Sequence, residues 1–438
     1  MIRRFVVAFC WILLPAGCAH TPYNREYVSK SLVERTGHHL KNGANPDAFE
    51  LPEKLSLTDG LTADEAVAIA LWNNAQFQAD LAELGFARAD LIEAGLLRNP
   101  MLSLLFPVGP KQLEATLSLP ADLLWQRPKR VAAAKLDAER VAENLVQHGL
   151  DLARAAIIAH ADLALAETRK NLAAENARLQ QEIANIAAAR LRAGDISALE
   201  ESASRLEALR AQENFVRHTQ AFDAAQARFT TLLGLGGRDT TFTLIAATEA
   251  ELPSRTYAEL TKEAFASRPD LRAAELAIEA AGKRLGWERT KILNLTGVLD
   301  ANGAGKEGFE MGPGVQIELP LFNRNNAKTA RAQAQIEQAM RQYLAAQHRI
   351  ALEVKEAHLD YLAAQQTLAL CRSQWAPAAT EAAIRAQKAY AAGEDSYLFV
   401  LEINRQLLEA RWREAEAAAD LQRATARLKH SVGFYHLP

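Results

Sequence analysis

The sequence has few cysteines, few aromatic residues and no strong excess of charge of either sign. Its 438 residues include three cysteines and 7% aromatic residues, and the formal net charge at pH 7 is −3. The absence of a basic bias argues against nucleic-acid binding. The sequence also has no nucleophile constellation, no phosphate-binding glycine-rich loop and no HExxH motif, so it indicates neither an enzyme nor a cofactor.

Proline and glycine are missing from long segments that are rich in alanine. Residues 129–233 contain no proline and two glycines, Gly149 and Gly194. Residues 129–193 hold 20 alanines among 65 residues, and residues 321–376 contain neither glycine nor proline. This composition predicts two very long helices, the first of about 97 Å at 1.5 Å per residue.

The N-terminal segment has the organisation of an export signal. Arg3 and Arg4 precede the apolar run Phe5–Leu14. That run is too short to span a membrane as a helix, which takes about 20 residues. Residues 1–17 are therefore predicted to be a signal peptide with a small-residue cleavage site.

The end of this segment resembles a bacterial lipoprotein box, in which the cysteine becomes the lipidated first residue. Cys18 is that cysteine, but Pro15 stands where such boxes usually carry leucine. An ordinary signal peptide with an incidental cysteine is the alternative. We expect residues 18–57 to form a lipidated, extended N-terminal arm. Cys371 would then be the only free cysteine of the mature chain, so no intrachain disulfide is expected.

Two pairs of short segments alternate between apolar and polar residues, as half-buried strands do. In residues 113–119 the odd-numbered positions are apolar and the even-numbered positions are polar, and residues 315–319 repeat the pattern. We expect one hairpin over residues 101–119 and a longer one over residues 295–319. The strands of the first hairpin are short against the 9–11 residues that a membrane-spanning strand needs.

The chain repeats one plan twice. The motifs LSLP and IELP end at Pro120 and Pro320, an offset of 200, and two short turns place Gly194 and Gly393 at an offset of 199. Each repeat has the order helix, hairpin, long helix, turn, helix. The predicted first repeat, mid-height linker and second repeat span residues 58–235, 236–256 and 257–438. Pro377 is expected to kink the second long helix, and single shorter helices are expected over residues 61–97, 197–233, 257–291 and 396–432.

These lengths predict a rod about 100 Å long. Two shorter helices placed end to end match one long helix, so strands would cap one end and the glycine turns would close the other. Four strands leave two sheet edges exposed, and closed single-chain barrels begin at about eight strands. The chain is therefore expected to oligomerise, and three copies would provide twelve strands.

The repeat plan and its junctions resemble the TolC-like outer membrane factor family. The resemblance is carried by LLRNPML before the first hairpin, by LSLP and IELPLFNR at the strand-to-helix junctions, and by the RAGDIS and AAGEDS turns. It covers residues 58–434. The stretch LSLPADLLWQRPKRVAAA is most similar to the heavy-metal and RND-type efflux branch, which includes CzcC- and CusC-like lipoproteins.

The resemblance implies a mainly α fold with a small β part. Each chain would contribute four strands to a 12-stranded outer-membrane β-barrel and its helices to a long periplasmic α-helical barrel. The implied partners are two further copies in a homotrimer, outer-membrane lipid, a periplasmic membrane-fusion adaptor and an inner-membrane RND-type transporter. The implied location is the bacterial outer membrane, with a lipid anchor and an extension into the periplasm.

The function implied is a passive duct of a tripartite efflux system of RND or heavy-metal type. A type I secretion exit duct and a periplasmic coiled-coil scaffold without a pore are alternatives, and the alternating strands count against the scaffold because a tether needs none. His148 and His160 have no ligand-type residue at i+4, so no metal site is expected.

The two glycine turns are the candidate sites. Each stops one helix and caps the next. Ser197 begins a capping box with Glu200, whereas Phe399 stands at the matching position after Ser396. The resemblance implies that these turns dock the adaptor. The residues expected to take part are Gly194, Asp195, Ser197, Leu199, Gly393, Glu394, Ser396 and Leu398.

The same turns carry charged residues that form a candidate gate. Around a trimer, their carboxylates would form rings that favour cations and pair with nearby basic residues as an electrostatic latch. The candidate gate residues are Asp195, Glu394, Asp395, Arg190, Arg192 and Lys388. Because two acids are adjacent in the second turn, that turn is the better candidate.

Overall fold

The structure is a computed structural model, and it describes most of the chain beyond the predicted signal peptide. The described residues are 22–41, 49–52, 55–56, 59–106, 113–121, 123–237, 242–245, 255–303, 308–392 and 394–435. Cys18 and residues 1–17 lie outside them. The chain divides into two compact units, and each unit draws on both predicted repeats. The first unit comprises residues 1–28, 81–146 and 269–348, and the second comprises residues 29–80, 147–268 and 349–438.

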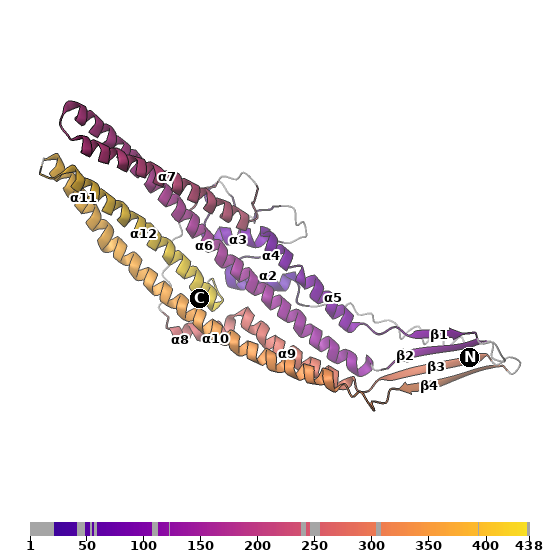
Figure 1. The fold of residues 1–438 in the computed structure, drawn as a ribbon. Helices are drawn as coiled ribbons and strands as arrows, with labels where there is room; N and C mark the ends of the chain where they lie inside the picture. Colours follow the sequence, from indigo (N-terminus) through magenta and orange to yellow (C-terminus); the bar gives the residue numbers. More distant parts are fainter. Residues whose placement is uncertain are drawn as a thin grey trace. The chain divides into compact units, whose positions relative to one another are not determined.

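The elements follow the predicted order of helix, hairpin, long helix, turn and helix (Figure 1). From the N-terminal side through the first repeat they are α2 (Arg25–Thr36), α3 (Ala63–Asn73), α4 (Ala75–Asp80), α5 (Glu83–Gly95), β1 (Met101–Leu105), β2 (Leu113–Pro120), α6 (Leu123–Ala193) and α7 (Ala198–Leu232). The second repeat contains α8 (Tyr257–Ser267), α9 (Pro269–Thr290), β3 (Leu295–Gly303), β4 (Phe309–Ile317), α10 (Asn326–Leu370), the π-helical turn η1 (Cys371–Trp375), α11 (Ala376–Ala391) and α12 (Tyr397–Val432).

Two expectations about helices need correction. The segment expected to be an extended arm contains α2. The helix expected over residues 61–97 is broken at Asn74 and again at residues 81–82, and the one expected over residues 257–291 is broken at Arg268. The second long helix is interrupted beside Pro377, as expected, and the interruption is the π-helical turn η1. Proline has no N–H to donate, and a single π-turn in front of it takes up the irregularity.

The helix α2 is held by its apolar face rather than lying free. Leu32 and Leu40 are fully buried in the second unit. A side chain at Gly149 of α6 would come within 2.7 Å of Leu32 and 3.3 Å of Phe77. Gly149 is therefore the position at which α2 and α4 approach the backbone of α6 closely, which explains a glycine in the middle of a long helix.

The four strands form one antiparallel sheet in the order β1-β2-β3-β4 within the first unit (Figure 1). Its register pairs Leu102 with Leu117 and Leu117 with Leu299, so the two hairpins join through β2 and β3. The strands have 5, 8, 9 and 9 residues, so both strands of the first hairpin are short, as expected. In the described chain, β1 and β4 each pair on one side and leave one edge open.

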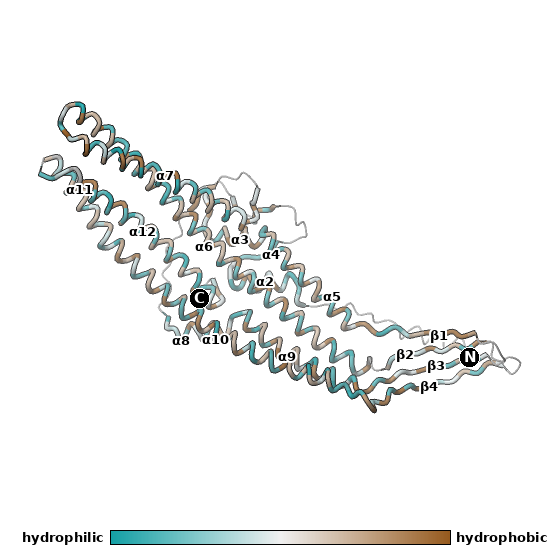
Figure 2. Tube along the Cα trace, in the orientation of Figure 1, coloured by the Kyte–Doolittle hydropathy of each residue, from teal (hydrophilic) through white to brown (hydrophobic). Residues whose placement is uncertain are grey.

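The large buried side chains of the second unit come from the region of the short helices α2 and α3, from the middle of α6 and from the C-terminal end of α7. Its large, fully buried side chains are Leu32, Leu40, Leu61, Ile69, Leu71, Leu150, Leu163, Phe229, Leu233 and Leu235. Towards the glycine turns the buried positions of the long hairpins are mostly alanine, such as Ala184, Ala208 and Ala386. The tube in Figure 2 changes between apolar and polar along every long helix. No described helix is long and apolar enough to cross a membrane.

At Asn74 and at Arg268, residues of the helix break bond the C-terminal carbonyls of another helix, α7 in the first repeat and α12 in the second. In the first repeat the Asn74 side-chain amide donates to the carbonyl of Leu232, the last residue of α7, at 2.9 Å. In the second repeat Ser267 Oγ donates to the carbonyl of Val432, the last residue of α12, at 2.5 Å. Arg268 donates to the carbonyl of Ser431 at 3.3 Å. The last carbonyls of a helix have no partner inside the helix, so these contacts satisfy them.

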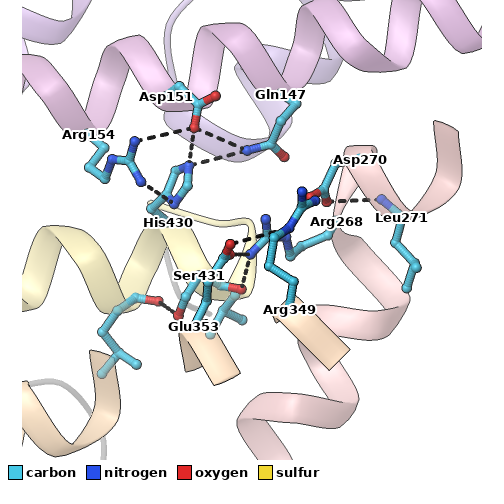
Figure 3. Close-up of polar contacts among 12 residues, drawn as sticks. Gln147, Asp151, Arg154, Arg268, Asp270, Leu271, Arg349, Glu353, His430 and Ser431 are labelled. Carbon is cyan, nitrogen blue, oxygen red and sulfur yellow. Dashed lines mark hydrogen bonds and ion pairs between the residues drawn. The ribbon is translucent and has the colours of Figure 1, made fainter. Parts of the chain in front are cut away.

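We call each place where a helix break bonds the end of another helix a joint: the first lies at Asn74 and the second at Ser267 and Arg268. The second joint includes an ion pair (Figure 3). Arg268 is almost fully buried and pairs with Glu353 of α10 at 2.5 Å. His430 Nε2 lies 2.6 Å from Asp151 Oδ1, and its Nδ1 lies 3.3 Å from Arg154. Since the guanidinium can only donate, Nδ1 accepts and Nε2 donates to Asp151. These contacts connect α8, α10 and α12 of the second repeat with α6 of the first.

The glycine after α7 gives a direct test of the first joint. Gly234 has a φ of +76°, and a Cβ there would lie 2.2 Å from the carbonyl oxygen of Asn73. Gly237 has a φ of +79° but open space around it. We expect Gly237→Ala to cost about 1–2 kcal/mol for the left-handed backbone alone. Gly234→Ala adds a backbone clash and should lower the free energy of unfolding by clearly more, as measured by guanidinium unfolding followed by circular dichroism. Equal losses would contradict the close approach.

Asp151 gives the second joint a pH dependence. It is partly buried, which opposes ionisation, but His430, Arg154 and Gln147 outweigh this and hold the pKa of Asp151 below its usual value. A lowered folded pKa adds stability that is present above the unfolded pKa of about 3.8 and is lost as pH falls through the folded pKa. Asp151→Asn should therefore lower the unfolding midpoint at pH 7, with the difference shrinking below pH 4. Asp223→Asn, at an exposed site without a described partner, should change neither the unfolding midpoint nor its dependence on pH. If Asp151→Asn lowers the midpoint by the same amount at every pH, the linkage is wrong.

Candidate functional site

The first glycine turn is a complete helix stop followed by a complete cap. Gly194 has a φ of +82°, and its N–H donates to the carbonyl of Leu191 while Asp195 N–H donates to that of Arg190, both at 3.0 Å. This is the Schellman arrangement of helix ends. Ser197 then accepts from the N–H of Glu200, whose carboxylate accepts from the N–H of Ser197. The predicted capping box is confirmed.

The second turn is built in the same way but is less fully bonded. Glu394 N–H donates to the carbonyl of Ala389 at 2.9 Å, the equivalent of the bond made by Asp195. Ser396 caps α12 through a long 3.4 Å contact to the N–H of Phe399, which cannot return a bond. The predicted difference between the caps is confirmed. Gly393 and the side chain of Leu398 lie outside the described residues.

The predicted gate residues gather at the two turns, but they are not paired with one another in the chain as described. Asp195, Glu394 and Asp395 are exposed, and none forms a hydrogen bond or ion pair through its carboxylate among the described residues. Arg192 donates to the carbonyl of Ala188 in its own helix, and Lys388 is exposed. The carboxylates are therefore available to other chains.

Arg190 has a partner that the sequence reasoning missed. Its guanidinium donates to the hydroxyl of Tyr390 at 2.5 Å, which joins the last turn of α6 to the last turn of α11 within the second unit. The repeat offset contained the signal, because residues 190 and 390 are 200 apart and precede equivalent glycines. Leu199, also expected in the docking surface, is 79% exposed.

The sheet presents two chemically different faces. Residues that pair directly across strands share a face, and the register therefore sorts the described strands into two sets. One set is apolar and mostly exposed: Leu102, Leu104, Leu113, Ala115, Leu117, Leu119, Leu295, Leu299, Ala301, Phe309, Met311, Pro313, Val315 and Ile317. The other set is mainly polar: Ser103, Glu114, Thr116, Ser118, Thr296, Asp300, Asn302, Glu310 and Gln316. Among its exceptions are Met101, Leu105 and Val298, and β1 is apolar on both faces.

The polar face holds carboxylates without basic partners. Asp300 accepts from the Thr116 hydroxyl at 2.8 Å and from the Asn302 amide at 2.9 Å. The register places Glu114, Asn302 and Glu310 in one row across β2, β3 and β4. The strands as described carry no lysine or arginine on this face. One face suits lipid, and the opposite face suits water and cations.

The described residues show no group of three or more metal-ligating side chains that could hold an ion. His160 is buried against Leu61, to whose carbonyl its Nε2 donates at 3.0 Å, and burial lowers its pKa. His148 lies 3.3 Å from Asp80. Both histidines on the long helix thus make contacts within the fold.

Comparison with known families agrees with this geometry. Residues 260–434 match the model of the family described as outer membrane efflux protein. The match confirms the predicted resemblance over this segment. It supports the predicted role of an outer-membrane channel component of an efflux system, a passive duct rather than an enzyme.

Relatives and solved structures extend the match beyond the second repeat. The cobalt-zinc-cadmium resistance protein CzcC of Cupriavidus metallidurans is 25% identical over 378 residues, which cover 85% of this chain and 90% of CzcC. The structure is similar to CusC, with a TM-score of 0.73, 18% identity and coverage of 90% of this chain and 98% of the other. It is also similar to the open state of the MtrE channel of Neisseria gonorrhoeae, with a TM-score of 0.69, 18% identity and coverage of 88% and 95%. The structural likenesses confirm the predicted TolC-like fold.

Because the cap of α7 is more complete than that of α12, removing the cap residue should loosen the first turn of α7 more than that of α12. Ser197→Ala removes one side of a reciprocal cap and should cost about 1 kcal/mol locally, so amide exchange in the first turn of α7 should rise about fivefold. Ser396→Ala removes a long single contact and should change exchange in α12 less. Hydrogen exchange followed by mass spectrometry measures both. Glu200→Gln is the matched control, because glutamine also completes a capping box; exchange as fast as in Ser197→Ala would contradict the cap as the cause.

Proposed function

We propose that the chain forms a homotrimeric duct of RND or heavy-metal type, with its sheet in the outer membrane and its helices in the periplasm. The observation that carries the proposal is the two-faced sheet with open edges at β1 and β4. An apolar face that is exposed along all of β1 and β4 and along part of β2 and β3 is unstable in water and suits lipid. A coiled-coil scaffold without a pore would not account for such a sheet.

The open edges support assembly into a closed ring. Unpaired N–H and C=O groups cannot remain in the hydrocarbon region, so β1 of one copy would pair with β4 of the next. Three copies give the twelve strands of a small barrel, whose interior would be the polar face that bears Asp300 and Glu310. Head-to-tail pairing of this kind closes into a cyclic oligomer.

The duct would receive its substrate from other proteins. Within the proposal the glycine turns meet a periplasmic membrane-fusion adaptor through Gly194, Asp195, Ser197, Leu199, Gly393, Glu394, Ser396 and Leu398. An inner-membrane transporter of RND type supplies the energy.

The likeness to a cobalt-zinc-cadmium resistance protein favours a heavy-metal cation as substrate. The acidic, base-free polar face is consistent with cation passage. Lipidation at Cys18 would anchor the N-terminus in the same membrane.

The assembly is tested on detergent-extracted protein from the outer-membrane fraction. We expect a mass of three chains and discrete conductance steps after insertion into planar bilayers. The sequence mass is 48.0 kDa per chain, before signal-peptide removal and lipidation. A particle of one chain that neither fractionates with the outer membrane nor conducts would sink the proposal.

The gate is a separate proposal that rests on the turn residues. We infer that Asp195, Glu394 and Asp395 of neighbouring copies, with Arg190, Arg192 and Lys388, hold the periplasmic mouth closed. Arg190 is already positioned by Tyr390, so its remaining N–H donors can reach a carboxylate of another copy.

Closed-state conductance tests the gate. Asp395→Ala should raise the conductance of single channels in planar bilayers several-fold, because it removes one carboxylate per copy at the mouth. Tyr390→Phe should raise it less, since it only releases Arg190. Asp223→Asn, which removes an exposed carboxylate of α7 away from the turns, is the control and should leave the conductance unchanged. An unchanged closed state in Asp395→Ala would refute the role of this acid in the latch.

A further inference from the structure

One end of the sheet carries a surface that the duct function does not itself require. The antiparallel register brings the start of β1, the end of β2, the start of β3 and the end of β4 to the same end of the sheet. All four strands connect there to helices of the first unit. At this end the segment after β4 adds the apolar residues Leu319 and Leu321, which are 70% and 69% exposed, and the completely exposed Phe322.

The loop that presents Phe322 is fixed by contacts within the first unit. Asn325 adopts a φ of +58° and donates through its side-chain amide to the carbonyl of Glu288 at 2.8 Å and to its carboxylate at 3.0 Å. Leu321 N–H donates to the carbonyl of Leu319 at 2.8 Å. A left-handed asparagine bonded twice to the end of α9 holds this loop in place, so Phe322 is displayed on a rigid turn.

Basic residues surround these apolar side chains. The cations are exposed and form no hydrogen bond or ion pair among the described residues: Lys129, Arg289, Arg324, Lys328 and Arg331. The two acids in the described segments 123–131, 286–294 and 318–331 are already engaged. Glu288 accepts from Lys291 at 2.5 Å, and Glu318 accepts from Asn294 at 2.6 Å. Lys328 also interacts electrostatically with Glu288, but the five exposed cations outnumber the two acids, so the surface carries net positive charge beside exposed apolar groups.

We propose that these residues form a lipid collar that binds the anionic headgroups of phospholipids in the periplasmic leaflet of the outer membrane. The lipid collar comprises Leu319, Leu321 and Phe322 with Lys129, Arg289, Arg324, Lys328 and Arg331. The inference rests on the proposed function, which places this end of the sheet at the periplasmic side. Acyl chains would cover the apolar residues as they cover the apolar sheet face. The basic side chains would meet the phosphates, because an anionic lipid surface attracts nearby lysine and arginine.

Two features single out a lipid as the occupant. The apolar part of the collar follows directly in sequence after β4, which ends at Ile317, and its three side chains are exposed, so acyl chains that cover the apolar side of β4 can also reach them. Lys328 and Arg331 lie three residues apart at the start of α10 and therefore point to the same side of that helix. Arg324 lies two residues before α10, so three positive charges stand at the beginning of this helix and in its first two turns.

The test compares lipid binding by two triple variants of the full chain in its native oligomeric state. Native mass spectrometry of the delipidated protein, titrated with phosphatidylglycerol or phosphatidylethanolamine at low salt, gives the ratio of the two affinities. The first variant is Arg324→Gln, Lys328→Gln and Arg331→Gln. The control variant is Arg341→Gln, Arg385→Gln and Arg405→Gln, which removes three exposed cations of the helices away from the sheet.

We expect the wild-type chain and the control to prefer phosphatidylglycerol, and the collar variant to lose that preference by on the order of 100-fold, at about fivefold per cation. Phe322→Ala should weaken both lipids equally. A collar variant that keeps the preference, or a control that loses as much, would overturn the proposal. Conductance in phosphatidylcholine bilayers is measured in parallel. If the collar variant conducts in these bilayers, its duct is intact, and its lipid preference tests the collar alone. If the wild-type chain forms neither a trimer nor a conducting channel, the proposed function is wrong.

Discussion

The structure of the second unit depends on closing helix ends with residues placed at helix breaks. Two long hairpins rich in alanine bury little apolar area per residue, so they contribute little hydrophobic stabilisation along their length. The large buried side chains lie instead at the level where Asn74 and Ser267 bond the last carbonyls of α7 and α12. Helix ends that carried unsatisfied carbonyls into such a core would be costly. The breaks therefore allow the returning helices to end inside the protein.

These joints also explain the division of the chain. Each repeat gives its hairpin strands to one unit and its turn to the other. The same plan serves both repeats, but its chemistry differs. Asn74 closes the first joint with a neutral amide, whereas the second contains the ion pair of Arg268 with Glu353 and the contact of His430 with Asp151. The two turns also differ, since only the first has a reciprocal cap. The same plan is thus held by different polar contacts in its two copies.

Much of this organisation was predictable, because the signals were local and strong. Alternating polarity gave the strands and their faces, and the Ser197 box gave the start of α7. The helix breaks were missed although their signals were present: Pro269 begins α9, and Asn74 caps α4 by accepting from Phe77. Hydrophobic periodicity continued through both and concealed them. The burial of α2 and the contact between Arg190 and Tyr390 depend on residues more than 100 positions apart, so no local pattern could reveal them.

The sequence separates the tasks of the duct by residue type. Alanine lines the hairpins because close helix approach there leaves room for little else, while branched apolar residues are kept for the joints and the outer face of the sheet. Among the described residues, exposed charges without a partner in the chain recur at the turns, on the polar sheet face and in the collar. Water solvates such charges in an isolated chain, so they cost little there and stay free to pair with groups outside it. These three surfaces are the ones through which the proposed duct would act.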